Sequence, residues 1–174
     1  RCDNGARLLR ATIAQHIELD DIRDHALTAL CQHNGLLPTE PGDDIGAALR
    51  AAALDPEAPG SLAGGLHQLS TVAFNLRERM SLDNWRVISR LTDELSTAQP
   101  SEPGEVLERL DRCVQAMMTL SGFALDGMTR DQGWRFLSMG RRIERLQFMC
   151  AVLRHALAAA GDAPDWLLEL ADST

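Results

Sequence analysis

The stretch that decides the fold runs from Met128 to Arg145 and reads MTRDQGWRFLSMGRRIER. Apolar residues recur in it every three or four positions and continue beyond Arg145, which predicts one long helix over about residues 130–160. One face of this helix is expected to be its core face and carries Phe136, Met139, Ile143, Leu146, Cys150, Leu153 and Leu157. The opposite face is apolar at both ends, with Trp134, Leu137, Phe148 and Val152. A helix that is apolar on two faces is expected at the centre of a bundle.

Between the apolar ends of that second face lies a charged cluster, Arg141, Glu144 and Arg145. Buried arginines must be paired, and Glu144 alone cannot neutralise them, so one interpretation is a buried ion network that fixes the helix register. The other is an anion-binding cleft for a carboxylate or phosphate, because guanidinium groups suit bidentate recognition. Gly140, which costs about 1 kcal/mol in a helix relative to Ala, suggests close approach of another backbone. The candidate anion or partner site comprises Asp131, Trp134, Arg135, Arg141, Arg142, Glu144, Arg145 and Arg77.

The rest of the chain is also predicted to be helical, because no useful stretch alternates with period two. Proline and glycine mark the breaks between the elements. Helices are expected at about 4–19, 21–33, 43–54, 62–80, 82–97, 104–127, 130–160 and 164–172. Gly35 is expected to end one helix in a left-handed conformation, while Ser81 and Thr129 are expected to cap the starts of two others. The fold class is therefore all-α, a bundle of about seven or eight helices in which the long helix is central.

Composition excludes several kinds of catalysis. All 17 basic residues are Arg, with no Lys, and Tyr is absent as well. The chain therefore supplies no Schiff-base lysine, phosphate-loop lysine or phenolic acid, and no serine lies in a nucleophile-elbow pattern. These absences favour a role other than that of a self-contained enzyme, and no cofactor is predicted.

An acidic turn is the one sequence feature that resembles a metal site. It consists of Glu18, Asp20, Asp21, Asp24 and His25. Helical di-metal sites repeat a Glu-x-x-His pair, which this turn lacks, so a solvated helix start is the preferred interpretation and no metal is predicted.

Charge and cysteine usage bear on partners and location. The net charge of −8 makes nucleic acid an unfavourable partner. The four cysteines show no CxxC spacing. Three of them sit among helical residues, so buried, reduced thiols are the preferred interpretation. No apolar leader opens the chain, and the longest helical stretch without an acidic residue, Arg or His, Cys113–Leu125, is shorter than the ~20 residues that cross a bilayer. A cytoplasmic location without membrane contact is expected.

The run MTRDQGWRFLSMGRRIER resembles the signature of the alpha-E family, a predicted helical domain with a Glu-Arg motif. The segments LRERMSLDNWRVISRL and, at the end of the chain, WLLELADS are similar to that family too, so the resemblance covers most of the chain. Its variant of the signature most resembles that of the alpha-E domains that are fused to a circularly permuted ATP-grasp domain. Family members are encoded beside or fused to ATP-grasp ligases, which implies a part in making or modifying peptides.

The resemblance implies that residues 1–174 form a single helical domain, which we expect to be truncated at both ends relative to the family. Members carry an earlier Gly-Arg-x-x-Glu-Arg motif whose last residue corresponds to Arg1, and their closing helix continues into others. Three roles remain open. One is an accessory domain that binds an ATP-grasp ligase or its peptide product. The second is part of an enzyme site, in which the Arg/Glu cluster holds a carboxylate or phosphate intermediate. The third is a purely structural interaction module.

The first ten residues echo the second half of the long helix, because Arg1–Arg10 aligns with Arg145–Arg154. If the two stretches belong to related helices, their charges should meet. We therefore expect the first helix to lie beside the 130–160 helix, with Arg1 or Asp3 on the side of Glu144.

Overall fold

The computed structural model describes residues 1–19, 25–40, 42, 44–96, 100, 102–158 and 165–171. Within these ranges the regular structure is entirely helical, which confirms the all-α bundle. In chain order the elements are α1 (Cys2–Leu19), α2 (His25–His33), α3 (Ile45–Leu54), α4 (Leu62–Asn75), the 3-10 turn η1 (Arg77–Arg79), α5 (Leu82–Ser96), α6 (Pro103–Asp126), α7 (Gln132–Ala158) and α8 (Asp165–Ala171).

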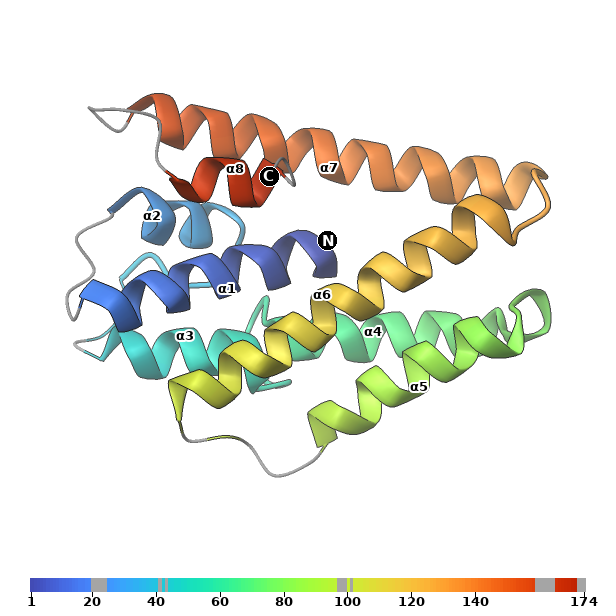
Figure 1. Cartoon of the computed structure of the whole chain (residues 1–174), viewed down its shortest axis with the longest axis horizontal. Coiled ribbons are helices and arrows are strands. Elements are labelled where there is room, and N and C mark those ends of the chain that lie inside the picture. The colour runs from blue at the N-terminus through green and yellow to red at the C-terminus, as the bar shows by residue number, and fades with distance from the viewer. Residues whose placement is uncertain are drawn as a thin grey trace.

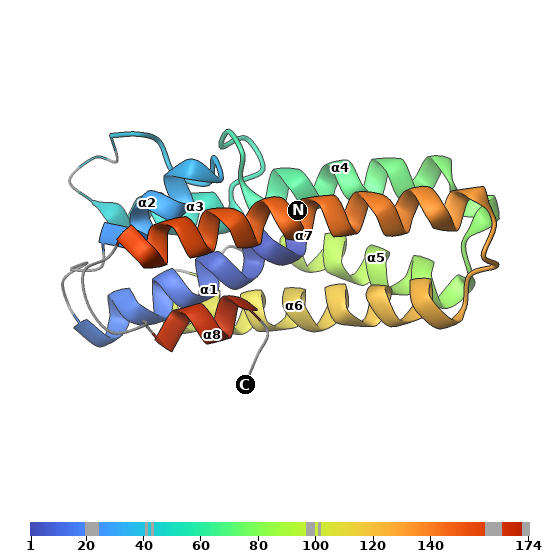
Figure 2. The ribbon, with the colours of Figure 1, turned by 90° about the horizontal axis from the view of Figure 1, so that it is seen from above.

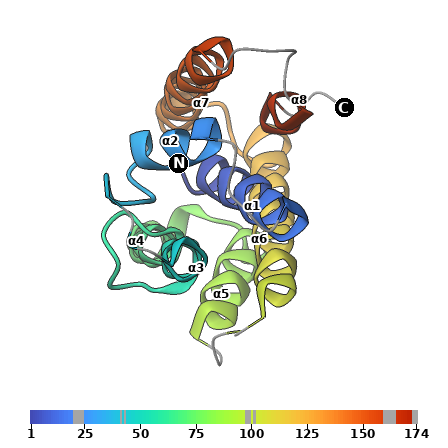
Figure 3. The ribbon, with the colours of Figure 1, turned by 90° about the vertical axis from the view of Figure 1, so that its left-hand side faces the viewer.

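The helix at the centre of the bundle is α1, and the prediction that the 130–160 helix would be central is wrong. Seen end-on, α1 is surrounded by the other helices, whereas α7 lies at the periphery (Figure 3). α1 packs against α2, α3, α4, α6 and α8. Its side chains suit that position, because Leu8, Leu9 and Thr12 are almost completely buried and the Thr12 hydroxyl donates to the Leu8 carbonyl at 2.8 Å.

Arg10 fastens this central helix to two of its neighbours. Its guanidinium lies 2.9 Å from a carboxylate oxygen of Asp111 on α6 and 2.9 Å from one of Glu169 on α8. One arginine that bridges two carboxylates fixes the relative position of three helices.

Two residues end or begin a helix as the sequence predicts. Gly35 has a φ of 73°, the left-handed conformation expected after α2. Ser81 caps α5, since its hydroxyl accepts from the backbone N–H of Asn84 at 3.2 Å. Gly60 also has a positive φ of 74°, and a Cβ there would collide with the carbonyl oxygen of Gly35, so two loops cross at paired glycines.

Two expectations about helix ends are wrong. Thr129 does not cap the long helix; the Asp131 carboxylate accepts from the Trp134 backbone N–H at 2.9 Å, and α7 begins at Gln132. Three residues separate this acceptor from the amide it caps, which is the usual spacing for an N-cap. The helix expected over 62–80 ends at Asn75, and the chain tightens into η1 before α5.

Two helical hairpins extend from the central part of the molecule. The α4–α5 hairpin and the α6–α7 hairpin both have their turns at the right-hand end of Figure 1, where α7 follows the upper edge and α5 the lower. From above, α7 is the foremost helix over most of its length (Figure 2). Across the described ranges, no helix is long and apolar enough to cross a bilayer.

Candidate functional site

The site predicted from the sequence begins at the first turn of α7. Asp131 caps the helix, and the Trp134 indole N–H donates to the Ala124 carbonyl of α6 at 2.9 Å. The Arg130 guanidinium lies 5.4 Å from the centre of the Trp134 ring, which is within cation–π range. These contacts fix the start of α7 against the end of α6.

Two arginines of the predicted cluster connect α7 to other helices. Arg141 donates from Nη2 to the Ser121 hydroxyl of α6 at 2.6 Å. Arg145 donates from Nη1 to Oδ1 of Asn4 at 3.3 Å, and Nδ2 of Asn4 donates to the Glu144 carbonyl at 3.4 Å. α1 therefore touches α7 beside Glu144 through Asn4, but the expected contact through Arg1 or Asp3 is not found among the described residues, and the two helices do not pack along their lengths. Asp3 instead pairs with Arg7 at 3.1 Å.

Arg135 and Arg142 line an open hollow on α7 of about 360 Å³. Its other lining residues are Trp134, Ser138, Met139, Ile143 and Leu146. Both arginines are exposed, and neither pairs with a carboxylate in the part of the chain that the structure describes. Two available guanidinium groups over an apolar floor can bind a carboxylate or phosphate, or the acidic side chains of a protein partner.

Among the residues that the structure describes, the buried ion network considered for this cluster does not form. Arg141, Arg142 and Glu144 are exposed, and Arg145 is only partly buried. The side chain of Glu144 faces solvent, while its backbone carbonyl accepts the bond from Asn4. The cluster is therefore a surface feature.

The expected core face of α7 is exposed. Phe136, Met139, Ile143, Leu146, Cys150, Leu153 and Leu157 all lie at the surface. The buried residues of α7 are Phe148, Ala151 and Val152, which belong to the opposite face and lie in its second half. α7 packs against α2 and α8. The prediction is wrong because both faces are apolar, and periodicity alone does not say which of them meets the protein.

The first half of α7 contains most of the candidate residues, and little of its surface is buried against the rest of the molecule. No residue from Gln132 to Gln147 is buried. A Cβ built on Gly140 would meet open space, so the predicted close approach of a second backbone is not found among the described residues.

Arg77 lies apart from the other candidates. It belongs to η1 and stacks over Trp85 of α5, with 5.4 Å between the guanidinium and the ring centre. Phe74 contacts the same ring, at 6.2 Å between centroids. Within the described ranges no hydrogen bond, ion pair or ring contact joins Arg77 to α7, so its role here is to close the α4–α5 hairpin.

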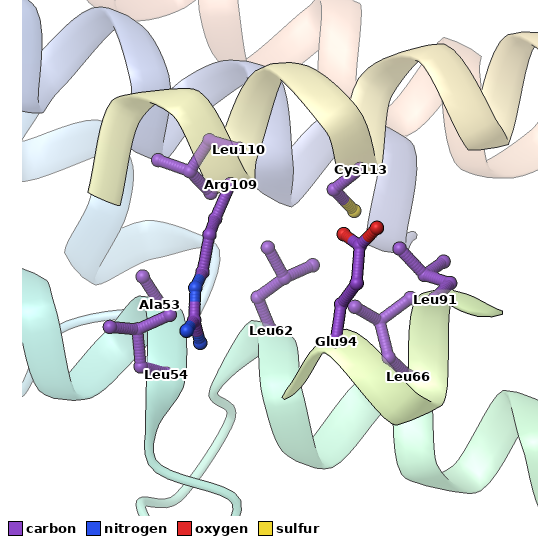
Figure 4. Close-up of a pocket in the computed structure, with 9 residues that line it drawn as sticks. All are labelled: Ala53, Leu54, Leu62, Leu66, Leu91, Glu94, Arg109, Leu110 and Cys113. Atoms are coloured by element: carbon purple, nitrogen blue, oxygen red, sulfur yellow. The ribbon is translucent and has the colours of Figure 1, made fainter. Parts of the chain in front are cut away.

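A second cavity, of about 10 Å³, lies between α3, α4, α5 and α6 and was not indicated by the sequence. Figure 4 shows Arg109 descending from α6 towards Ala53 and Leu54, while the Glu94 carboxylate approaches Cys113. A space of this size holds about one water molecule, so it is a packing defect and not a ligand site.

Two of the four cysteines are buried as expected. Burial raises the pKa of the Cys31 thiol to about 12, and it does the same for Cys113. Cys2 is partly buried, and Cys150, which the sequence placed on the core face of the long helix, is exposed. In the acidic turn considered for metal binding, Asp20, Asp21 and Asp24 lie outside the described residues.

Sequence reasoning missed the partners of the charged cluster. Asn4, Ser121 and Arg130 each contact a candidate residue, yet none of them stands out in the sequence. Of these three, only Asn4 was indicated by the sequence: the similarity between Arg1–Arg10 and Arg145–Arg154 predicted that these two stretches lie close together, and Asn4 belongs to the first of them.

Comparison with known proteins identifies the domain type. The family model named Alpha-E, described as a predicted alpha-helical domain with a conserved ER motif, matches residues 1–174. Uncharacterized proteins of Mycobacterium bovis (strain ATCC BAA-935 / AF2122/97) and Mycobacterium tuberculosis (strain ATCC 25618 / H37Rv) are each 32% identical to this chain over 113 residues. The match covers 60% of the chain but 13% of each relative, so the chain spans a small part of their length. No solved structure matches.

Proposed function

Because this chain belongs to the Alpha-E family, we propose that it is an accessory, partner-binding helical domain and not a self-contained enzyme. One observation carries the proposal: α7 exposes apolar and arginine side chains together over 132–147, a stretch without one buried residue. Contiguous exposed apolar surface of this kind marks an interaction site.

The partner that we propose is an ATP-grasp ligase that forms amide bonds, or its peptide product. The resemblance to domains associated with such ligases supports this choice. The arginines of α7 support it as well, because Arg135 and Arg142 pair with no carboxylate of the described residues and can bind acidic side chains or a carboxylate. The buried, unpaired thiols of Cys31 and Cys113 suit the cytoplasm, where we place the domain.

Binding between the purified chain and a purified ATP-grasp peptide ligase tests the proposal. We expect calorimetric titration to show binding that the double variant Arg135→Glu, Arg142→Glu weakens by tenfold or more, on the order of 1.4 kcal/mol. Arg50→Glu is the matched control, because Arg50 is also exposed but lies on α3. Absence of binding, or equal loss in the control, would contradict the proposal.

A second candidate function is a part of an enzyme site that holds a carboxylate or phosphate intermediate. The hollow between Arg135 and Arg142 favours it, since about 360 Å³ suits a small ligand. If this function is correct, citrate or phosphate raises the melting temperature of the native chain by mass action but not that of Arg142→Glu. An equal rise in both proteins would show a general salt effect.

A further inference from the structure

The exposed apolar residues of α7 follow a strict heptad spacing. They are Phe136, Met139, Ile143, Leu146, Cys150, Leu153 and Leu157, and the steps between them alternate between three and four residues. Apart from Cys150, which is also exposed, each has between 46% and 85% of its surface open to solvent. We name this stripe the α7 seam. A core-facing helix of a globular domain normally has a wider apolar stripe, whereas alternation of three and four is the pattern of a coiled coil.

The α7 seam has cations on its flanks and no carboxylate. In heptad terms, Phe136 and Ile143 occupy position a, and the two preceding g positions are Arg135 and Arg142. The e positions are Gly140, Gln147 and Arg154, the last of which contacts His33 at 3.1 Å. Glu144 is the one acidic residue of α7 and lies away from the seam, at position b. This helix is therefore cationic within a chain whose net charge is −8.

The hollow described above lies along one side of the seam. Its lining includes both flanking arginines and the seam residues Met139, Ile143 and Leu146. Gly140 borders the seam on the other side. Among the described residues, no heavy atom lies within 4 Å of the point that a Cβ at this position would occupy. A helix laid on the seam would fill this space and could approach closely at the glycine.

We propose that the α7 seam binds one amphipathic helix of a partner protein, with apolar residues at its a and d positions and Glu or Asp opposite Arg135 and Arg142. The inference rests on the proposed partner-binding function and specifies the chemistry of the partner. Its length would match residues 136–157. Charge decides between possible occupants: a second copy of α7 brings no carboxylate to the flanks, whereas an acidic helix pairs with both arginines.

Two designed peptides test the proposal without the ligase. Each has four heptads with Leu at positions a and d; one has Glu at e and g, and the other has Lys there. Fluorescence anisotropy should show that the native chain binds the Glu peptide better than the Lys peptide, by about tenfold for two exposed ion pairs. Ile143→Asp should abolish binding at an unchanged melting temperature, because Ile143 is exposed in the free chain.

A charge exchange makes the test independent of any loss of folding. The variant Arg135→Glu, Arg142→Glu should prefer the Lys peptide, a gain that a misfolded protein would not show. Arg50→Glu, on α3, should keep the native preference. Binding of neither peptide, or equal binding of both, would overturn the proposal.

Two other measurements identify the competing occupants. A dimer in sedimentation equilibrium that Ile143→Asp dissociates would assign the seam to a second copy of the chain. Binding to vesicles of anionic lipid that Ile143→Asp abolishes would assign it to a membrane surface. Either result overturns the acidic-helix proposal. If the ligase binds and Ile143→Asp has no effect, the proposed function stands without the seam; if the Glu peptide binds and the ligase does not, the seam stands without that partner.

Discussion

Phe136 and Phe148 are both phenylalanines of α7, yet Phe136 has 68% of its surface exposed and Phe148 only 3%. A separation of twelve positions turns the second ring by about a third of a revolution relative to the first. The sequence predicts that both are helical and apolar. It does not predict which of them meets the protein, since that depends on where α2 and α8 lie.

This pair gives a stability test within one helix. Phe148→Ala should lower the free energy of unfolding by about 3–5 kcal/mol, because it empties a buried site. Phe136→Ala should change it by no more than about 0.5 kcal/mol. Urea denaturation measures both, and a comparable loss in the two variants would show that the seam is covered in the free chain.

The buried thiols predict how stability changes at alkaline pH. Burial raises the pKa of Cys31 and of Cys113 from 9.0 to about 12. The unfolded chain therefore releases these protons first as the pH rises, so the contribution of the neutral thiols is complete below pH 9 and is lost towards pH 12.

Lys and Tyr are absent, so no other kind of side chain has an ordinary pKa between 9.0 and 12. Urea unfolding at pH 8 to 10.5 should show stability falling by roughly 1 kcal/mol per pH unit for each thiol once the pH exceeds 9. Cys31→Ala should reduce the slope, whatever its effect on stability itself. A slope that the variant leaves unchanged would rule out this thiol as its source.

Among the elements, most helices begin and end within a few residues of their predicted bounds, because Gly, Pro and capping side chains act locally. α4 is the clearest exception, since it ends at Asn75 and not near residue 80. Its end coincides with the packing of Phe74 and Arg77 on Trp85, a tertiary contact that a local pattern does not report. The contacts of α7 with Asn4 and Ser121 are of the same kind.

Those two contacts differ in how much they should stabilise the fold. Asn4 is 7% exposed, so Arg145→Ala removes the donor from a buried amide oxygen and should cost about 1–3 kcal/mol. Arg141→Ala removes an exposed bond to Ser121 and should cost less than about 1 kcal/mol. Thermal unfolding of both variants checks the order, and a larger effect at Arg141 would contradict the geometry.

At the scale of the molecule, composition and periodicity predict the all-α class, and the run around Glu144–Arg145 predicts the family. They do not predict that α1 is central and α7 peripheral. A helix with two apolar faces can lie at the centre of a bundle or at its edge. An apolar face that packs against other helices of the domain has the same residue spacing as one that packs against a partner protein, so the sequence does not distinguish the two. The α7 seam is therefore distinguished from a core face only by its exposure in the folded chain.

Hydrogen exchange over the whole chain, alone and with the Glu peptide, tests most directly whether the first half of α7 is a docking surface. In the free chain, amides of 132–147 should exchange much faster than those of α1, because no residue of that stretch is buried. The peptide should then slow exchange in 132–147 and leave α1 and α3 unchanged. Protection of 132–147 equal to that of α1 in the free chain, or peptide protection confined to other helices, would contradict the central claim.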